Sequence, residues 1–135
     1  MKVYVDIDGV LLANEENPAL HADDLIDYLV NNHEVYWLTT HCRGDNIPTQ
    51  LHIARHFPSQ NTLRNLGKIK ATNWDTWKTE AIDFSQPFLW LDDDLFNEER
   101  QELEAHQALD SFVMIDLRDD PGQLKKVIDG IRART

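Results

Sequence analysis

Short apolar runs alternate with amphipathic stretches along the chain. Four such runs, each bounded by charged or turn-forming residues, predict buried strands at residues 3–7, 34–38, 88–91 and 112–117. Between and after them the apolar positions recur near helical spacing, which predicts helices at residues 18–30, 47–57, 74–82, 97–108 and 121–132. Residues 59–73 are mixed and polar, and we expect a loop there.

This alternation of strands and helices predicts a parallel sheet with helices on both faces. The strand runs are nearly continuous in apolar residues, as burial on both faces requires. We therefore expect an α/β, Rossmann-like fold of three layers, with residues 1–135 forming one domain. Ligands of such sheets bind outside the carboxyl ends of the strands, so polar residues at those ends are the first candidates for function.

Charge and composition narrow the class of protein. The formal net charge of −11 disfavours binding to extended nucleic-acid duplexes and to anionic membranes, but an anionic substrate can still bind through a divalent cation. No apolar stretch approaches the roughly 20 residues that span a membrane. Asp6 and Asp8 interrupt the region where a signal peptide would be apolar, and the single cysteine, Cys42, fits a reducing compartment. We expect a cytoplasmic protein.

Polar residues end or follow all four predicted strands, with Asp116 and Arg118 at the fourth. Asp6 and Asp8 end the first strand, and in an extended chain their side chains point to the same side, about 7 Å apart. Gathering carboxylates on a buried strand is unfavourable unless another charge offsets theirs. With a carboxylate from Asp92 or Asp93, at the end of the third strand, the two can surround Mg²⁺. Gly9 lets the backbone turn sharply and approach a ligand.

Such a site favours the binding and transfer of a phosphoryl group. Thr39 offers a hydroxyl at the end of the second strand, and Lys78 offers a positive charge just before the third. One carboxylate can attack phosphorus to form an aspartyl-phosphate, and the other can act as general acid and then as base. We expect three further residues after the second strand to contact substrate, and these are Thr40, His41 and Arg43.

The order of these residues resembles the four motifs of the haloacid dehalogenase-like hydrolase superfamily. The motifs read DIDGV at residues 6–10, VYWLT at residues 35–39, Lys78, and LWLDD at residues 89–93. The resemblance covers the chain from residue 3 to about residue 94. It implies an aspartyl-phosphate phosphatase that requires magnesium.

The resemblance also implies a role for each matching residue. Asp6 is then the nucleophile and Asp8 the acid and base, while Thr39 and Lys78 hold the phosphate. Asp6 ligates Mg²⁺ together with Asp8, which in this family usually offers its backbone carbonyl. The last metal ligand is Asp93 or Asp92, with Asp93 preferred.

The spacing of the motifs resembles that of capless members of the superfamily. About 30 residues separate Asp8 from Thr39, and residues 41–73 are too few for a full cap domain. The tryptophan-containing motifs and the sequence DPGQL also resemble a small capless group found in RNA-repair proteins. This implies a phosphorylated small molecule, a nucleotide or a nucleic-acid end as substrate.

Other interpretations of the same residues remain. Thr40 can replace Thr39 as the working hydroxyl, and His52 with His56 has the spacing of a helical metal pair. A receiver domain also forms a phosphoaspartate, although its lysine follows the acceptor aspartate in sequence. A domain that keeps the fold and binds without turnover is the third alternative. A cysteine phosphatase needs an arginine six residues after Cys42, where this chain has Pro48.

Overall fold

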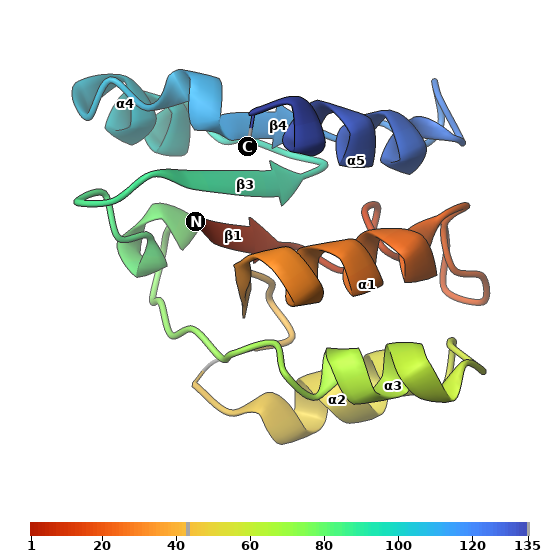
Figure 1. The fold of residues 1–135 in the computed structure, drawn as a ribbon. Helices are drawn as coiled ribbons and strands as arrows, with labels where there is room; N and C mark the ends of the chain where they lie inside the picture. Colours follow the sequence, from red (N-terminus) through yellow and green to blue (C-terminus); the bar gives the residue numbers. More distant parts are fainter. Residues whose placement is uncertain (43, 135) are drawn as a thin grey trace.

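The computed structural model describes residues 1–42 and 44–134, and a four-stranded sheet lies at its centre (Figure 1). All strand pairs are parallel, and the spatial order is β2-β1-β3-β4. Residues of β1 pair on both sides, as Val3 does with Val35 and with Leu89. All four predicted strands are confirmed, with ends that differ by up to three residues. The strands are β1 (Lys2–Val5), β2 (Glu34–Trp37), β3 (Phe88–Asp92) and β4 (Phe112–Met114).

Within the described residues, five α-helices and two 3₁₀ turns lie between and after the strands. The α-helices are α1 (Ala22–Asn32), α2 (Asn46–Ala54), α3 (Gln60–Leu66), α4 (Asn97–Ala105) and α5 (Gln123–Arg134), and the turns are η1 (Lys78–Ala81) and η2 (Leu109–Ser111). The first helix begins four residues later than predicted, because the preceding chain folds into turns. In these turns the Ala19 N–H donates to the carbonyl of Leu11.

Two of the predicted local structures are wrong. The predicted helix at residues 74–82 is reduced to η1, because the carboxylate of Glu80 accepts the backbone N–H groups of Asp75, Thr76 and Trp77 and closes a turn there. The predicted loop at residues 59–73 contains α3, whose N-terminus is capped by Ser59.

The pattern of apolar residues did not predict α3, because this helix buries polar residues. Thr62 and Asn65 are buried against α1, where both side chains donate hydrogen bonds to the carboxylate of Asp27. Satisfied polar groups can be buried at little cost, so a polar sequence here is compatible with a packed helix.

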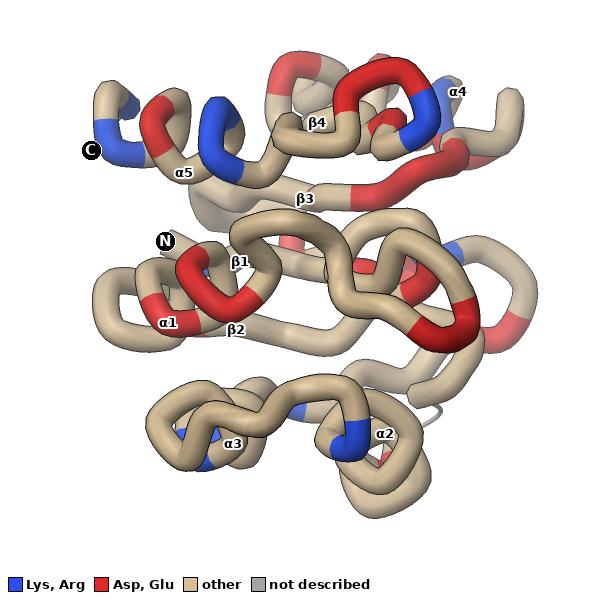
Figure 2. The backbone as a smooth tube through the Cα atoms, turned by 90° about the vertical axis from the view of Figure 1, so that its right-hand side faces the viewer, with Lys and Arg blue, Asp and Glu red and all other residues tan. Residues whose placement is uncertain are grey.

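Alternate residues of the sheet face two helical layers. Val3 and Val5 pack with residues of α1 and α5 on one face, whereas Tyr4 and Trp90 pack with Leu103 of α4 on the other. The α/β fold of three layers is therefore confirmed. In two views α2 and α3 lie beyond β2, at the end of the sheet opposite β4 (Figure 1, Figure 2).

The chain that follows α3 covers the outer edge of β2. The backbone N–H of Trp37 donates to the carbonyl of Lys70 at 2.9 Å, and the N–H of Lys70 donates to the carbonyl of Val35 at 2.9 Å. This pairing satisfies the edge of the sheet and fixes α2 and α3 beside it. Among residues 1–42 and 44–134, no helix has the length and apolar character that crossing a membrane requires.

Candidate functional site

The carboxyl ends of β1 and β3 bring three carboxylates together. Asp6 follows β1 directly, and its backbone N–H still donates to the carbonyl of Leu91 at 3.1 Å, so it lies beside the end of β3. Oxygens of Asp6, Asp92 and Asp93 all lie within 4.8 Å of one another. Figure 2 looks onto this end of the sheet and shows acidic stretches next to the ends of these strands.

Lys78 provides the positive charge within this group. Its Nζ lies 2.7 Å from Oδ2 of Asp92 and 3.4 Å from Oδ2 of Asp6, and its side chain is only 14% exposed. The backbone N–H of Lys78 donates to the buried carboxylate of Glu99 at 3.0 Å, which ties η1 to the start of α4. Trp90 adds an indole N–H that donates to Asp92 at 3.1 Å.

The electrostatics of the group favour additional positive charge. Burial, and then repulsion by Asp6, raise the pKa of the Asp92 carboxyl to about 6 despite the contact with Lys78. Burial, and then the neighbouring Asp92, raise the pKa of Asp93 to about 6 as well. Burial disfavours the charged form of Lys78, but attraction to Asp6 and Asp92 outweighs it and raises its pKa. Lys78 is therefore charged at neutral pH, but its single positive charge does not balance the negative charge of the three carboxylates.

A tight turn after β1 makes room for Asp93. The carbonyl of Ile7 accepts N–H groups from Val10, Leu11 and Leu12, and Gly9 has a φ of +79°. A Cβ at Gly9 would lie 2.2 Å from Oδ2 of Asp93. Glycine is thus required here both for its left-handed backbone and for the close approach of this carboxylate.

Asp8 belongs to a different group of side chains. The strand ends at Val5, so Asp8 does not share an extended segment with Asp6 as the sequence predicted. Oδ2 of Asp8 lies 2.7 Å from Nε2 of His41, and Oδ1 lies 3.8 Å from Nε2 of His52 on α2. The two imidazole rings stack with centroids 4.0 Å apart. Burial, and then repulsion by His41, lower the pKa of His52.

The remaining predicted residues lie around His41. Thr39 is fully buried, and its Oγ1 accepts the backbone N–H of His41 at 3.3 Å, whereas Thr40 is exposed in the same turn. Arg43 lies outside the described residues. His56, the other member of the suggested helical metal pair, has its ring centroid 6.3 Å from that of His52.

An open cleft of about 940 Å³ connects these features. Asp8, Gly9, His41 and Asp93 line it, together with two exposed arginines from distant parts of the chain, which are Arg55 at the C-terminal end of α2 and Arg118 after β4. No acidic side chain within the described residues forms an ion pair with either arginine. Sequence reasoning missed Arg55 and Glu99 as parts of the site, and it considered His52 only as a partner of His56, because only the fold returns α2 and α4 to this end of the sheet.

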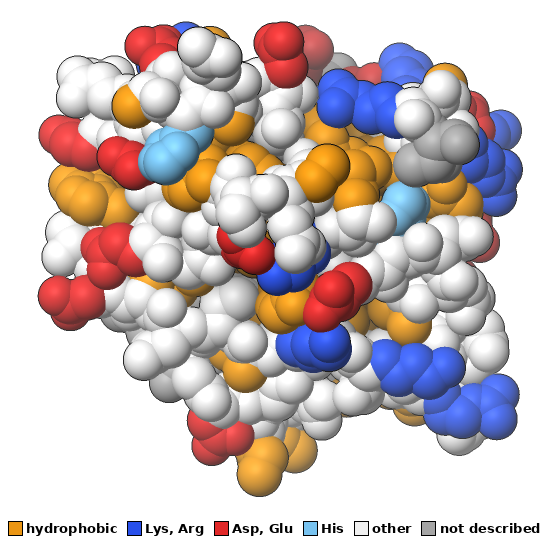
Figure 3. Space-filling view, turned by 60° about the vertical axis from the view of Figure 1, so that its left-hand side comes forward, with side chains coloured by type: hydrophobic (Ala, Val, Ile, Leu, Met, Phe, Trp, Pro, Cys, Tyr) orange, Lys and Arg blue, Asp and Glu red, His pale blue; other side chains and the backbone are white. Residues whose placement is uncertain are grey.

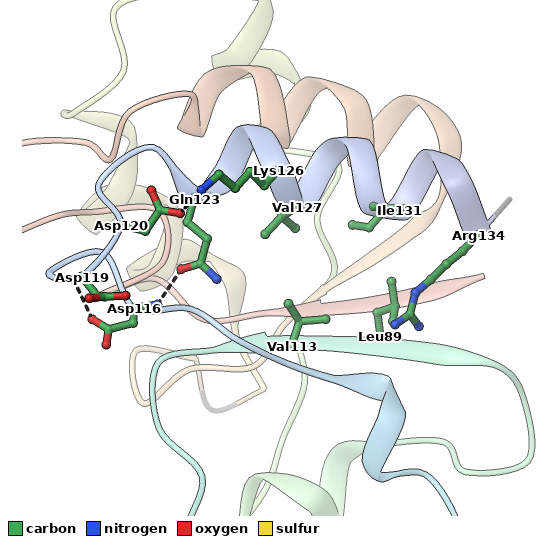
Figure 4. A pocket seen from close by; sticks show the side chains of 11 residues that line it. Leu89, Val113, Asp116, Asp119, Asp120, Gln123, Lys126, Val127, Ile131 and Arg134 are labelled. Atoms are coloured by element: carbon green, nitrogen blue, oxygen red, sulfur yellow. Dashed lines mark hydrogen bonds and ion pairs between the residues drawn. The ribbon is translucent and has the colours of Figure 1, made fainter.

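A second cavity, of about 400 Å³, lies between α5 and the sheet (Figure 4). Its floor is apolar, with Leu89, Val113 and Ile131, and its polar end is satisfied from within the chain. There, Oε1 of Gln123 accepts the N–H of Asp116 at 2.7 Å, and Nε2 of Gln123 donates to a carbonyl of β4 at 2.8 Å. These bonds hold α5 against β4, so we interpret the cavity as a consequence of helix packing and not as a binding site.

Comparisons with known proteins give no relative of this chain. No protein-family model matches it, and no curated protein or solved structure matches it.

Proposed function

We propose that this protein is a magnesium-dependent phosphomonoester hydrolase of the haloacid dehalogenase-like kind, acting through an aspartyl-phosphate on Asp6. One observation carries the proposal: three carboxylates, two of which pair with the largely buried Lys78, gather at the carboxyl end of a parallel sheet, next to an open cleft. Carboxylates are gathered in this way where a hard divalent cation and an anionic substrate share a site.

The donor set fits Mg²⁺. Asp6 and Asp93 would hold the ion, because the oxygens of Asp92 already accept from Lys78, Trp90 and the backbone N–H of Asp94. The raised pKa values of Asp92 and Asp93 indicate that Lys78 alone does not balance the carboxylate charge, which favours a bound cation. Because Gly9 has no side chain, the carboxylate of Asp93 can lie against it beside the cleft. When bound, Mg²⁺ offsets the carboxylate charge and attracts the phosphoryl oxygens.

Asp6 and Asp8 carry the two chemical steps. A carboxylate oxygen of Asp6 attacks phosphorus, the bond from phosphorus to the leaving oxygen breaks, and Asp8 in its acid form gives that oxygen a proton. Water then attacks the phosphorus of the aspartyl-phosphate while Asp8 accepts its proton. This step releases inorganic phosphate and regenerates the carboxylate of Asp6.

Lys78 keeps the nucleophile in position and adds fixed positive charge. Its contacts with Asp6 and Asp92 restrict the rotation of both side chains, and the backbone N–H of Ile7 donates to Oδ1 of Asp6 at 2.8 Å. A preorganised cation stabilises the charge that accumulates on a transferring phosphoryl group. Thr39, held in the turn before His41, supports the wall of the site.

The open cleft favours a substrate larger than a simple phosphate ester. Arg55 and Arg118 can contact further anionic groups, which a nucleotide or the end of a nucleic acid would carry. The net charge of −11 opposes longer contacts with a polyanion. We therefore favour a nucleotide or a terminal nucleic-acid phosphate as substrate.

Phosphate release tests the proposal directly. The panel comprises nucleotides, sugar phosphates and oligonucleotides phosphorylated at the 3′ or 5′ end, each with Mg²⁺ and with a chelator. We expect release that requires Mg²⁺, is abolished in Asp6→Asn and is retained in Asp129→Asn, a matched change on the exposed face of α5. Release that survives in Asp6→Asn contradicts the assigned nucleophile.

A second candidate is a domain that binds a phosphate group without turnover. The contact between His41 and Asp8 favours it, because this contact ties the proposed acid and base to an imidazole rather than to the Asp6 group. In that case the folded protein binds Mg²⁺, but no member of the panel yields phosphate.

A further inference from the structure

We propose that Asp8, His41 and His52 form a second metal site, one that takes a borderline transition cation such as Zn²⁺. Two imidazole nitrogens and a carboxylate oxygen of these residues lie within 4.8 Å of one another. The donor set differs in kind from the three carboxylates of the Asp6 group. Imidazole nitrogen suits zinc and its neighbours, whereas an all-oxygen group suits magnesium.

The distances between the donor atoms are close to those of a zinc site. Ligands about 2.0–2.1 Å from a tetrahedral ion lie roughly 3.3 Å from each other. The 2.7 Å from Oδ2 of Asp8 to Nε2 of His41 and the 3.8 Å from Oδ1 of Asp8 to Nε2 of His52 lie on either side of that value, so the carboxylate must turn for one oxygen to face both rings. Three protein ligands and a water molecule complete the coordination of such an ion.

His52 supplies an independent indication. Its Nε2 atom is shielded from solvent and has no hydrogen-bond partner among the described residues, although the adjacent cleft is polar. A buried polar atom without a partner is unfavourable, and a bound cation would satisfy it. Asp8 is the only carboxylate that the described ion pairs place next to this nitrogen.

Binding requires a small rearrangement. The imidazole planes are 20° apart and stacked, whereas a metal–nitrogen bond lies in the plane of its own ring. Each ring must therefore turn partly out of the stack. Both side chains have room to do so, since they are 32% and 27% exposed and line the open cleft.

The position of the site gives it a regulatory consequence, which rests on the proposed phosphatase function. A cation held by the Asp8 carboxylate prevents that group from donating or accepting a proton. Zn²⁺ is therefore expected to inhibit phosphate release even when Mg²⁺ is in excess.

Cobalt titration tests the site without reference to activity. Co²⁺ is added to the folded protein in excess Mg²⁺, and its visible absorption reports a low-coordinate site with nitrogen ligands. We expect one such site in the wild type and in His106→Ala, a control histidine on the far helical layer that contacts Glu102 and Phe84. Loss of a supporting group around a metal costs 10- to 100-fold in affinity, so His41→Ala and His52→Ala should each lose at least about tenfold. Equal Co²⁺ binding in all four proteins overturns the proposal.

Two further readouts separate this proposal from the phosphatase. Substoichiometric Zn²⁺ should shift the ring proton NMR signals of His41 and His52 together and leave those of His106 in place, and absence of these shifts contradicts the site. If phosphate is released, Zn²⁺ should inhibit the wild type at least about tenfold more strongly than His52→Ala, each relative to its own rate. If no phosphate is released, the phosphatase fails while the cobalt and NMR results still decide the metal site.

Discussion

Asp92 and Asp93 are neighbours in the sequence, but their surroundings give them different roles. Asp92 is 1% exposed and accepts from Lys78 and Trp90, so its charge is used to hold the lysine. Asp93 faces the cleft and lies against Gly9. The sequence offered both as metal ligands, with Asp93 preferred, because two adjacent aspartates after a strand do not reveal which of them other side chains will bury. The geometry supports Asp93 as the ligand and Asp92 as its support.

The raised pKa of Asp93 predicts a pH-dependent stability in chelator. In the unfolded chain this carboxyl titrates near 4, whereas in the folded protein its pKa is about 6. The folded protein thus binds more protons between these values, and the free energy of unfolding falls as the pH rises from about 4 to about 6. Asp93→Asn removes this loss, so the variant should be more stable than the wild type at pH 7 and equal to it below about pH 4.

Denaturant unfolding in EDTA across this pH range provides the measurement. Asp129→Asn should follow the wild type at every pH, since that carboxylate lies on the exposed surface of α5. Addition of Mg²⁺ should stabilise the wild type more than Asp93→Asn. A variant that is less stable than the wild type at neutral pH in EDTA would show that Asp93 stabilises the fold.

Two glycines give a matched test of the turn after β1. Gly9→Ala places a Cβ 2.2 Å from Oδ2 of Asp93 and forces a left-handed backbone, so we expect a loss of about 1–3 kcal/mol in the free energy of unfolding. Gly130 lies within α5, and a Cβ there meets nothing within 4 Å. Gly130→Ala should therefore stabilise the protein by about 0.5–1 kcal/mol. Urea unfolding of both variants measures the difference, and equal effects would contradict the turn geometry.

At the scale of elements, the strands were predictable and several connections were not. β1 and β3 contain short runs of apolar residues, which are typical of buried parallel strands. The polar residues at the ends of these runs indicated where the candidate site lies. The predicted loop at residues 59–73 was wrong because α3 is held by hydrogen bonds from Thr62 and Asn65 to Asp27. Such partners are far apart in sequence, and local periodicity carries no information about them.

The attachment of η1 to α4 determines where Lys78 lies, and Glu99 provides it. This buried carboxylate accepts the N–H of Lys78 at 3.0 Å and that of Phe96 at 3.1 Å. Each N–H left without a partner costs about 1–3 kcal/mol, so Glu99→Ala should destabilise the fold by about 2 kcal/mol or more. Glu98→Ala, an exposed neighbour, should stay within about 0.5 kcal/mol of the wild type. Thermal and urea unfolding measure both variants, and similar stabilities would show that η1 is held by other contacts.

At the scale of the whole molecule, charge is distributed unevenly between the two ends of the sheet. Three carboxylates lie where β1 and β3 end, whereas Lys2 at the start of β1 pairs with Asp83 at 3.0 Å, and Lys70 pairs with Glu34 at 2.7 Å. Figure 3 brings forward the side on which the strands begin and shows such basic and acidic side chains next to one another. These pairs offset charge on that side, whereas oxygens of Asp6, Asp92 and Asp93 gather within 4.8 Å of one another beside the cleft.

This distribution predicts how substrate length affects binding. If the proposed function holds, a terminal phosphate enters a cleft that offers Arg55 and Arg118, whereas further phosphates of a longer chain meet a protein of net charge −11. KM for oligonucleotides with a 5′-phosphate, or their inhibition constant as competitors, should therefore rise between a dinucleotide and a chain of about 20 nucleotides at low salt. The difference should shrink at 0.1 M salt, where the screening length is about 10 Å.

Chains of equal length with an uncharged methylphosphonate backbone are the control, and their KM should not depend on length. If charged chains instead bind more tightly as they lengthen, with the salt dependence of phosphate contacts, the protein has a cationic track along its surface. Lys2, Lys70, Lys78 and Lys126 each have a carboxylate partner, so these four lysines would add little to such a track. Recognition is then confined to the end of the substrate, where a cation at the carboxylates and two arginines can meet its charge.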